Sequence, residues 1–538
     1  MSRSCGTLRQ IYVLNVSTGK IMKKRYYMGI DIGTSQSKGV VVDRQGRIAA
    51  FKAVDHDTVS IRQGFFEHDP EKVWFHDLVY LIRALLKEGG IRSEEVISVG
   101  ISAIGPCVVM TDQEGKPLRD AILYGIDTRA EKEIQLLNQR YGQEYFISKC
   151  GNSLSSQSAG PKILWVRRNE PEVFCRTKMI MTAASYLVFR LTGRNVMDYY
   201  TACAGYTPLF SCEDMCWDVE MCRELGCAGM LPELMWSDMP AGTVTRKAAE
   251  LTGLSEGTVV NAGTSDAAAE AVRVGAAEPG KTFLMMGSTA FIIKVMDRME
   301  RDVRMWSAPF VFPGTYSLSG GMSASGSLTK WFLEEMAPDV QKEARQEGVN
   351  AYERLSKMAE KIPPGCGGLL ALPYFCGERT PIFDSSAKGV FFGLNLNHTR
   401  MHLYRALLEG VGSGIRDNLN VLDCYGDLYD EIVTAGGGCR NRLWLQIISD
   451  ITGKSQALKE ITVGAAYGDA FLGGLASGEI DREEIEEWNR EEARIIPDES
   501  ARTIYDRWYD IYKGIYISTK EYMEELDRIT KDEKEENL

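Results

Sequence analysis

The sequence YMGIDIGTSQSKGVVVD, residues 27–43, predicts two β-strands joined by a glycine-hydroxyl turn. Apolar residues lead up to the turn, with Asp31 as the one charge among them, and three valines begin the return strand. Gly33 lets the backbone approach a phosphate group closely, because it has no side chain. The segment therefore suggests phosphate binding, although a surface hairpin with a polar loop would show the same pattern.

Donor groups surround this turn. Thr34, Ser35 and Ser37 supply hydroxyl and amide donors, and Lys38 supplies a positive charge. An acid at the end of an apolar strand that faces such a turn, here Asp31, suits a hydrated magnesium ion that bridges nucleotide phosphates.

A segment of the same design lies in the other half of the chain. TFLMMGSTAFIIKV, residues 282–295, again predicts an apolar strand, a glycine-hydroxyl turn and an apolar strand. Neither segment contains GxxxxGK[ST], so neither is a P-loop in which a helix N-terminus cradles the phosphates. Two such hairpins in two halves of one chain predict a two-lobed ATPase whose cleft holds the nucleotide.

Length and charge agree with this organisation. The chain has 538 residues, which is too long for one hydrophobic core, and two large domains are expected. A net charge of −12 argues against nucleic acid or an anionic membrane as the main partner, since both are polyanions. No run of about 18 apolar residues is present, so we expect no transmembrane helix.

The first 25 residues lack the apolar block of a secretory signal. We expect either a disordered leader or a start codon upstream of the natural one, which would then lie near Met22. The chain has 13 cysteines, and without such a signal they indicate a reducing cytoplasm.

Cys212, Cys216, Cys222 and Cys227 form the one cysteine cluster that could be considered as a metal site. Their spacing matches no common zinc pattern. We expect instead an amphipathic helix in which cysteines replace small apolar residues.

Strands and helices alternate along the chain, which is typical of an α/β fold. The nearly continuous apolar strand over residues 96–104 predicts burial on both faces of a sheet. The second half begins near Glu278. Beyond Asp481 the chain is charged and helical.

The turn AGTSD places Asp266 where a strand gives way to a helix of small residues. A lone carboxylate at that point can act as a general base that takes a proton from an attacking hydroxyl group. Asp is also among the best helix N-cap residues, and on this segment alone the N-cap is the favoured interpretation.

Two further segments can contact ligands. In TAGGGCRN, the glycines at 436–438 allow a ligand ring to lie against bare backbone, and Asn441 supplies an amide in the first helical turn. A tight strand–helix turn is the alternative, but it needs fewer glycines. In ILYGIDTRA, Asp127 and Arg129 follow a strand end and can hydrogen-bond sugar hydroxyls, and a surface ion pair is an equal alternative.

Taken in order, these motifs resemble the FGGY family of carbohydrate kinases, in the actin–hexokinase–heat-shock ATPase superfamily. The resemblance covers about residues 27–478 and rests on GIDIGTS, DTR, TSD, GST, GERTP, GVFFGL with ALLEG, and AGGGCRN. It implies an α/β fold of two ribonuclease-H-like (actin/hexokinase-type) lobes with a catalytic cleft between them. The implied boundaries are residues 26–273 for the N-terminal lobe, 274–482 for the nucleotide-binding C-terminal lobe, and 483–538 for a charged helical extension.

The resemblance also implies a role for each candidate residue. Asp266 occupies the position of the proton acceptor, and Asp31 that of the acid on the magnesium side. The residues implied to contact the nucleotide are Thr34, Ser35 and Lys38 in the first phosphate loop, Gly287, Ser288 and Thr289 in the second, Gly326 and Lys330 beside the nucleotide, and Gly437, Gly438 and Asn441 in the adenosine pocket. Those implied to contact the sugar are Gly105, Pro106, Asp127, Arg129 and Asp266.

The implied activity is phosphorylation of a hydroxyl group of a small sugar, with ATP as donor and Mg2+ as the metal. The chain most resembles the xylulokinase branch, so a ketopentose such as xylulose is the expected acceptor. In that branch the strand after the first helix usually ends in Gly-Gln-Met-His-Gly, whereas residues 103–107 here read Ala-Ile-Gly-Pro-Cys. Buried polar groups discriminate strongly between substrates, so another ketose, a polyol or a sugar acid stays open.

Proteins of another class remain as alternatives. A nucleotide-gated chaperone or filament protein would share both hairpins but lack Asp266 and the family signatures. A non-catalytic regulator that binds sugar or nucleotide would be expected to lose Asp31 or Asp266, and both are present. The expected partner is a small sugar, without a nucleic acid or membrane partner. The oligomeric state stays open, with a homodimer as one option.

Overall fold

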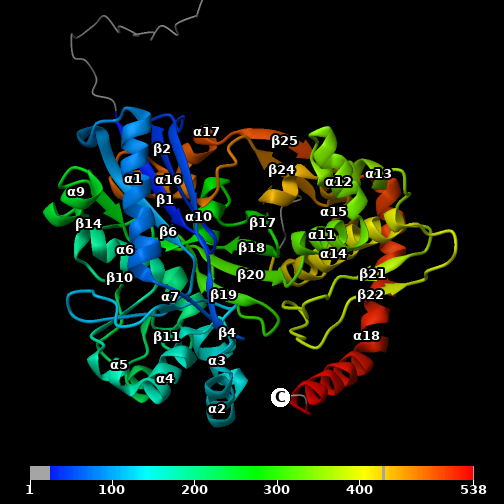
Figure 1. Ribbon diagram of the computed structural model, residues 1–538, viewed down its shortest axis with the longest axis horizontal. Coiled ribbons are helices and arrows are strands. Elements are labelled where there is room, and N and C mark those ends of the chain that lie inside the picture. The colour runs from blue at the N-terminus through cyan, green and yellow to red at the C-terminus, as the bar shows by residue number, and fades with distance from the viewer. Residues whose placement is uncertain (1–24, 427–430, 537–538) are drawn as a thin grey trace, which may run out of the picture.

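Two lobes lie side by side, and each is built around a seven-stranded sheet (Figure 1). The computed structural model describes residues 25–426 and 431–536. The expectation of two α/β lobes is confirmed. The leader expected over residues 1–25 lies outside the described residues except for Arg25.

Strand β1 lies inside the N-terminal sheet, antiparallel to β2 and parallel to β6. The strand order is β14-β15-β6-β1-β2-β3, and β16 pairs with the end of β6. Because β1 and β6 are covered on both faces, they are almost entirely buried, as expected for residues 96–104. The strands are β1 Tyr26–Ile32, β2 Gln36–Asp43, β3 Ile48–Asp55, β6 Val96–Ala103, β14 Pro240–Thr243, β15 Val259–Asn261 and β16 Thr264–Ser265.

The C-terminal sheet repeats this arrangement. Its order is β19-β20-β18-β17-β23-β24-β25, so β17 again lies between an antiparallel hairpin partner, β18, and a parallel strand, β23. The two predicted hairpins therefore occupy equivalent places in two sheets. The strands are β17 Thr282–Met286, β18 Ala290–Met296, β19 Trp306–Pro309, β20 Tyr316–Met322, β23 Glu431–Ala435, β24 Ser455–Lys459 and β25 Glu491–Ile495.

Helices and short strands surround the two sheets. In the N-terminal half they are β4 Val59–Arg62, β5 Phe65–His68, α1 His76–Gly89, β7 Val109–Thr111, β8 Ala121–Ile122, α2 Glu131–Tyr141, α3 Gln143–Cys150, α4 Ala159–Asn169, α5 Pro171–Arg176, β9 Met179–Met181, α6 Ala183–Thr192, β10 Val196–Asp198, α7 Tyr199–Gly205, β11 Phe210–Ser211, β12 Cys216–Trp217, α8 Val219–Leu225, β13 Glu233–Met235, α9 Arg246–Thr252 and α10 Asp266–Arg273. In the C-terminal half they are α11 Gly326–Trp331, α12 Pro338–Glu347, α13 Ala351–Ala359, β21 Leu370–Leu372, β22 Val390–Phe392, α14 Arg400–Asp423, α15 Arg442–Thr452, α16 Ala465–Ala476, α17 Ile485–Trp488 and α18 Glu499–Glu536. No helix over residues 25–426 and 431–536 has both the length and the apolar character needed to cross a membrane.

Helix α16 comes late in the chain but packs on the N-terminal sheet, as Figure 1 shows by its orange ribbon beside the blue strands. The packing is backbone to backbone. A Cβ atom at Gly29 would overlap the carbonyl oxygen of Ala466, and one at Gly100 would overlap that of Asp469. Glycine on the strands is therefore required at this contact. Part of the segment expected to form the C-terminal lobe thus belongs in space to the N-terminal one.

A charged helical extension was expected for residues 483–538. The described part of this segment also contains a strand. After α17 it supplies β25, which pairs antiparallel with β24 at the edge of the C-terminal sheet. Helix α18 then packs on that lobe against α15 and β21, so the extension is part of the lobe and not an appendage to it.

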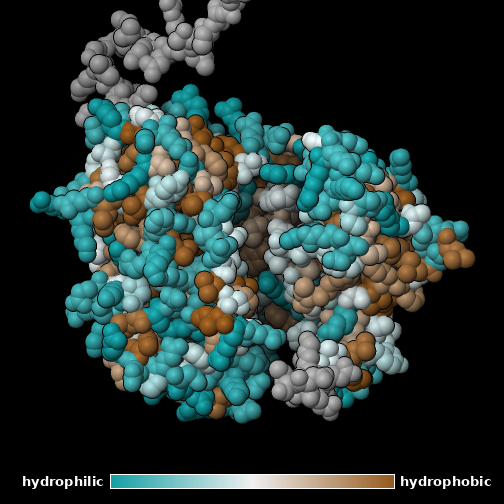
Figure 2. All heavy atoms as spheres, in the orientation of Figure 1, coloured by the Kyte–Doolittle hydropathy of each residue, from teal (hydrophilic) through white to brown (hydrophobic). Residues whose placement is uncertain are grey.

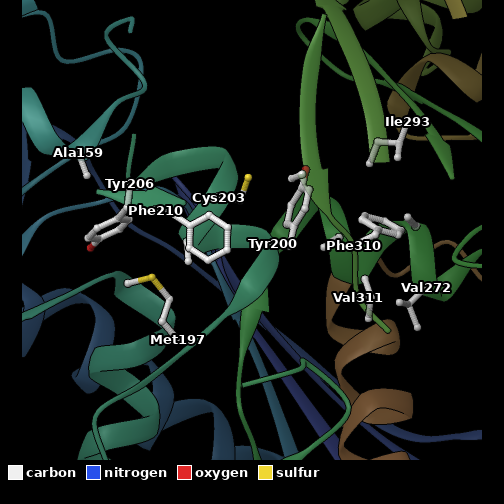
Figure 3. Close-up of a cluster of buried hydrophobic side chains, with 14 of the residues drawn as sticks. Ala159, Met197, Tyr200, Cys203, Tyr206, Phe210, Val272, Ile293, Phe310 and Val311 are labelled. Carbon is white, nitrogen blue, oxygen red and sulfur yellow. The ribbon is translucent and has the colours of Figure 1, made fainter. Parts of the chain in front are cut away.

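Figure 2 shows a cleft between the two lobes, and side chains of the two lobes also contact each other directly. Figure 3 shows Tyr200 of α7 facing Phe310, which follows β19, and their ring centroids are 5.3 Å apart. Beside them, the amide of Asn152 donates to the carbonyl of Ser307 at 2.8 Å and accepts its N–H at 3.0 Å. This junction fixes one edge of the cleft.

Candidate active site

The first hairpin presents its turn at the end of β1. Asp31 is paired with Lys38 across the hairpin, and the N–H of Gly33 donates to the carbonyl of Gln36 at 3.1 Å. A side chain at Gly33 would meet that same oxygen at 2.6 Å, so glycine is needed to close the turn. The hydroxyl of Thr34 lies 3.1 Å from that of Tyr124, which lines the neighbouring cavity.

A histidine that the sequence reasoning missed holds this turn from behind. One ring nitrogen of His56 lies 3.1 Å from the carbonyl oxygen of Gly33, and the other lies 2.9 Å from the carboxylate of Asp77 in α1. Ser37 was expected to add a donor at the phosphate turn, and this expectation is wrong. Its hydroxyl is buried and donates to Asp77 at 2.8 Å, because alternate residues of a strand point to opposite faces.

The second hairpin is joined to the start of α11. The N–H of Gly326 donates to the carbonyl of Gly287 at 3.0 Å, and the N–H of Ser327 donates to that of Ser288 at 3.1 Å. A Cβ atom at Gly326 would lie 2.5 Å from the Gly287 oxygen, which explains the glycine at this position. Lys330 lies at the other end of α11, where its side chain is 65% exposed and 3.9 Å from Glu334.

The three glycines after β23 have different surroundings. Gly436 and Gly438 pack against Met286, the last residue of β17, and Cβ atoms there would lie 2.5 Å from its carbonyl oxygen and 2.7 Å from its Cβ. Gly437 has open space where a Cβ atom would be. Two glycines therefore serve the packing of the turn, and Gly437 leaves bare backbone for a ligand. The side chain of Asn441 caps α15 by accepting the N–H of Trp444 at 3.1 Å.

Asp266 is the first residue of α10, and its neighbour Ser265 is the N-cap. The hydroxyl of Ser265 accepts the N–H of Ala268 at 3.4 Å, while the carboxylate of Asp266 accepts the adjacent N–H of Ala267 at 2.8 Å. Asp266 also lines a cavity between the lobes. The N-cap interpretation is therefore wrong for Asp266, whose side chain faces the cavity.

Three carboxylates near the end of β1 influence one another. Burial raises the pKa of Asp31 to about 7, and the charge of Asp266 adds to the increase. Burial likewise raises the pKa of Asp266 to about 6, with a contribution from the charge of Glu270. Asp469 on α16 is fully buried, so its pKa is raised as well. The hydroxyl of Ser102 lies between two of them, 2.7 Å from Asp469 and 3.3 Å from Asp31.

These acids fit a magnesium ion that arrives with a nucleotide. Over the described residues, no group of three or more His, Cys, Asp or Glu side chains is arranged to hold a metal ion by itself. Mg2+ usually keeps several waters and needs one or two carboxylates besides phosphate oxygens. Asp31 provides one such carboxylate, and Oδ1 of the neighbouring Asp469 is buried without a hydrogen-bond partner. The raised pKa values show that this region favours added positive charge.

The cavity beside Asp266 has a volume of about 250 Å3. This is slightly smaller than typical small-molecule pockets, at about 300–1,000 Å3, and suits a compact acceptor. Gly105 and Pro106, for which the resemblance implies a sugar contact, line this cavity. Its other walls include Tyr124, Asn152, Tyr200 and Thr201 from the N-terminal lobe and Thr289, Phe291, Trp306 and Arg379 from the C-terminal lobe. No histidine is among the described residues that line it.

Two family models match the chain. The model for the N-terminal domain of the FGGY family of carbohydrate kinases matches residues 26–272, and the model for the C-terminal domain matches residues 283–477. The chain belongs to this family. The kinase is 30% identical to the xylulose kinase of Bacillus subtilis (strain 168), over 92% of this chain and 98% of that one. It is 26% identical to the gluconokinase of the same organism, over 85% of this chain and 88% of that one.

The fold agrees with the family. The crystal structure of xylulose kinase from Rhodospirillum rubrum superposes on the kinase with a TM-score of 0.85 and 28% identity, covering 93% of this chain and all of that one. The protein is therefore a sugar kinase, a phosphotransferase with an alcohol group as acceptor. ATP is the phosphate donor that this family uses.

Asp127 and Arg129 do not line the cavity of the kinase, and the expectation that they contact the sugar is not met. Both side chains are buried. The guanidinium group of Arg129 donates to the Asp127 carboxylate, and the N–H of Phe66 donates to it at 2.8 Å. Arg129 also donates to Glu67 at 2.6 Å and lies over the ring of Phe65. The two residues form a structural ion pair that joins the segment after β8 to β5. The pair is buried, so the alternative of a surface ion pair is also wrong.

Sequence reasoning missed Arg379 and Asp469. Arg379 belongs to the GERTP motif, whose glycine and proline predict a shaped loop but not where the loop points. Asp469 interrupts the small-residue helix AAYGDAFLGG, and an acid within such a packed helix was the available signal. Both positions depend on contacts between segments that are far apart in the sequence.

The cysteine segment of the kinase is only partly helical. Cys212 and Cys216 lie at the β11–β12 hairpin, and Cys222 lies in α8, which is shorter than expected. Within the part of the chain that the structure describes, none of these cysteines belongs to a group that could hold a metal.

Proposed function

We propose that the kinase transfers the γ-phosphoryl group of ATP to a hydroxyl group of a small ketose, with a ketopentose such as xylulose as the first candidate. The observation that carries the proposal is the place of Asp266. Its carboxylate faces a compact cavity that also contains Thr289 of the second hairpin, while Tyr124 connects the cavity to Thr34 of the first. An acceptor in this cavity would lie beside both phosphate loops.

Asp266 is the proposed general base. The acceptor hydroxyl would give its proton to this carboxylate as the oxygen attacks the γ-phosphorus atom. A pKa of about 6 keeps Asp266 ionised at neutral pH and makes it a stronger base than an ordinary aspartate, whose pKa lies near 4. The carboxylate is already positioned by the N–H of Ala267, so little reorganisation is needed.

The phosphates would be bound by backbone and hydroxyl donors of the two turns. Thr34, Ser35 and Lys38 belong to the first turn, and Ser288 and Thr289 to the second. Asp31 would hold a hydrated Mg2+ on the phosphates, where the ion supplies positive charge that offsets the charge of the polyphosphate.

The nucleoside would lie against the turn after β23. Gly437 leaves open backbone there, and Gly438 and Asn441 continue the same surface into the start of α15. Gly326 places the start of α11 beside this surface, because it bonds the second hairpin. We assign no ATP contact to Lys330, whose exposed ammonium group lies near Glu334.

A sugar acid is the second candidate acceptor. Arg379 is a cation in the cavity wall, and the Bacillus subtilis gluconokinase shares 26% identity with this chain. The absence of a lining histidine also separates this cavity from the pattern expected for the xylulokinase branch. A non-catalytic regulator is less well supported, since Asp31 and Asp266 are both present and Asp266 lines the cavity.

The test is an ADP-release screen over ketopentoses, ketohexoses, polyols and aldonic acids, with the product position determined by NMR. We expect the highest kcat/KM on a ketopentose, and a higher value on an aldonic acid would favour the second candidate. Turnover on any acceptor should disappear in Asp266→Asn. A background rate of ATP hydrolysis across the whole panel would contradict the proposed acceptor classes.

A further inference from the structure

The GERTP loop, residues 377–381, brings a cation to the catalytic cavity from the C-terminal lobe. Arg379 lines the cavity that contains Asp266, which belongs to the N-terminal lobe. Among the described residues that line this cavity, Asp266 and Arg379 are the two with charged side chains. The same lining includes Thr289 of the second phosphate hairpin. Arg379 is thus placed where donor and acceptor meet.

The guanidinium group of Arg379 is not ion-paired in the described part of the chain, although its charge opposes the rise in the pKa of the adjacent Glu378. Within the described residues, its guanidinium group makes no ion pair or hydrogen bond with a carboxylate, unlike the buried Arg129 and Arg405, which bond Asp127 and Glu409. Its side chain is half-buried. A half-buried guanidinium with unused donors is suited to bind an oxyanion.

The backbone of the loop is fixed on both sides of Arg379. Thr380 accepts the N–H of Gly321 at 2.6 Å and donates to Asn418 of α14 at 2.6 Å. The carboxylate of Glu378 accepts two N–H groups at 2.7 Å, one from Arg379 and one from Ser323. The charge of Arg379 is therefore presented from a rigid support, as electrostatic preorganisation requires.

This support is continuous with the phosphate-binding elements. Ser323 directly follows β20 and lies three residues before Gly326, where α11 contacts the second hairpin. On the other side of the cavity, the positive charge of Arg379 opposes the increase that burial causes in the pKa of Tyr124, whose hydroxyl contacts Thr34. Arg379 therefore lines the same cavity as Thr289 of the second hairpin and Tyr124, which contacts the first.

The site has an excess of negative charge, which a cation such as Arg379 would offset. The charge of Asp266 contributes to the raised pKa values of Asp31 and Asp469, and a nucleoside triphosphate adds further negative charge. Magnesium on the Asp31 side offsets part of this charge. A cation on the acceptor side would act on the charge spread over the transferring phosphoryl oxygens.

We propose that Arg379 is a catalytic residue that donates hydrogen bonds to the oxygens of the phosphoryl group in transfer, from the lobe opposite Asp266. The proposal rests on the assignment of Asp266 as the base. The acceptor O–H bond breaks and its proton passes to Asp266, a new oxygen–phosphorus bond forms, and the bond to the β-phosphate oxygen breaks to release ADP. Arg379 stays protonated throughout.

The experiment compares Arg379→Gln, Arg379→Lys and a control, Arg400→Gln, on the acceptor that the wild-type kinase uses best. Arg400 pairs with Asp339 at the surface, outside the cavity, and its loss should change little. Arg379→Gln should lower kcat about a thousandfold and leave the KM for ATP unchanged. Binding of ADP with aluminium fluoride and acceptor should weaken in parallel, while binding of ADP alone should not.

Arg379→Lys keeps the charge but loses the bidentate geometry, so it should recover part of the lost kcat. If Arg379→Gln shows a lowered melting temperature, the kcat of Arg379→Lys tests the catalytic role of Arg379 instead. A rise in the acceptor KM at unchanged kcat would mean that Arg379 binds a carboxylate of the acceptor, and it would overturn the proposal. Unchanged kcat in both variants would also overturn it.

ATP hydrolysis, in which water accepts the phosphoryl group, tests the role of Arg379 without any sugar acceptor. If no sugar of the panel is phosphorylated, the proposed acceptor classes fail. The hydrolysis rate of the wild-type protein can still be compared with that of Arg379→Gln. A loss of hydrolysis in the variant would support the role of Arg379, and equal rates would overturn it.

Discussion

Replacement of Asp31 by asparagine should stabilise the ligand-free kinase at pH 8 and weaken its response to ATP with Mg2+. Burial is the main cause of the raised pKa of Asp31, and the charge of Asp266 adds to it. The ionised carboxylate is therefore less favourable in the folded protein than in the unfolded chain. Asparagine has a similar shape and no charge, so the penalty disappears together with the attraction for a cation.

The magnitude follows from the pKa. A rise from 3.8 to about 7 corresponds to about 3 pH units, and each unit is worth about 1.4 kcal/mol. The ionised form thus lowers the free energy of unfolding by about 4 kcal/mol. The folded protein holds this proton more tightly than the unfolded chain, so stability falls as the pH rises from about 4 to about 7. The gain from Asp31→Asn should therefore be about 1.6 kcal/mol at pH 5 and about 4 kcal/mol at pH 8.

Urea unfolding of wild type and variant at pH 5 and pH 8 measures this effect. Asp302→Asn is the matched control, because a hydrogen bond from Arg304 lowers the pKa of that buried acid and its loss should destabilise the protein at pH 8. Melting temperatures with and without ATP and Mg2+ then report the cation site. A gain that is equal at both pH values, or no gain at pH 8, would refute the reasoning.

Three further predictions concern single residues. Asp266→Asn should lower kcat by at least about a hundredfold while calorimetry shows unchanged ATP binding, and wild-type kcat should fall below about pH 6 as Asp266 gains a proton; near-normal turnover of the variant would remove Asp266 from the role of base. Gly437→Ala should raise the KM for ATP about tenfold at an unchanged melting temperature, whereas Gly436→Ala should lower the melting temperature, because its φ is +99° and its Cβ would lie 2.5 Å from a carbonyl oxygen; the reverse pattern would place the nucleoside elsewhere. Arg129→Met leaves the buried carboxylate of Asp127 unpaired and should lower the free energy of unfolding by about 3–5 kcal/mol, and a change confined to the acceptor KM would restore its expected sugar contact.

The hairpins could be found from sequence because their signals are local, whereas Asp266 was singled out only by the order of the family motifs. Alternating apolar residues and a glycine-hydroxyl turn specify a hairpin within 17 residues, from Tyr27 to Asp43. The two-lobed fold followed from the repetition of that pattern at residues 282–295. The position of α16 could not be found in this way. Its packing on the N-terminal sheet depends on the fit of Gly29 and Gly100 to a helix more than 350 residues away.

Burial distinguishes residues whose local sequence contexts are alike. Asp127 and Asp266 each follow a strand, and the family resemblance implied that both contact the substrate. In the folded chain Asp127 is 0% exposed and bonded to Arg129, while Asp266 faces the cavity. Ser37 similarly follows Thr34 in the first turn but points into the lobe. Local chemistry does not distinguish these cases, because the partner that uses up a side chain comes from another element.

The sequence by itself determined the fold class and the two glycine-hydroxyl hairpins, because each depends on short runs of residues with a definite conformation, and the family resemblance pointed to Asp266 as the proposed base. Tertiary structure alone decided that Asp31, Asp266 and Asp469 share one charged region and that Arg379 of the other lobe lines the same cavity as Asp266. The reason is physical. Raised pKa values and an unpaired guanidinium arise from burial and from distances between segments that only folding brings together.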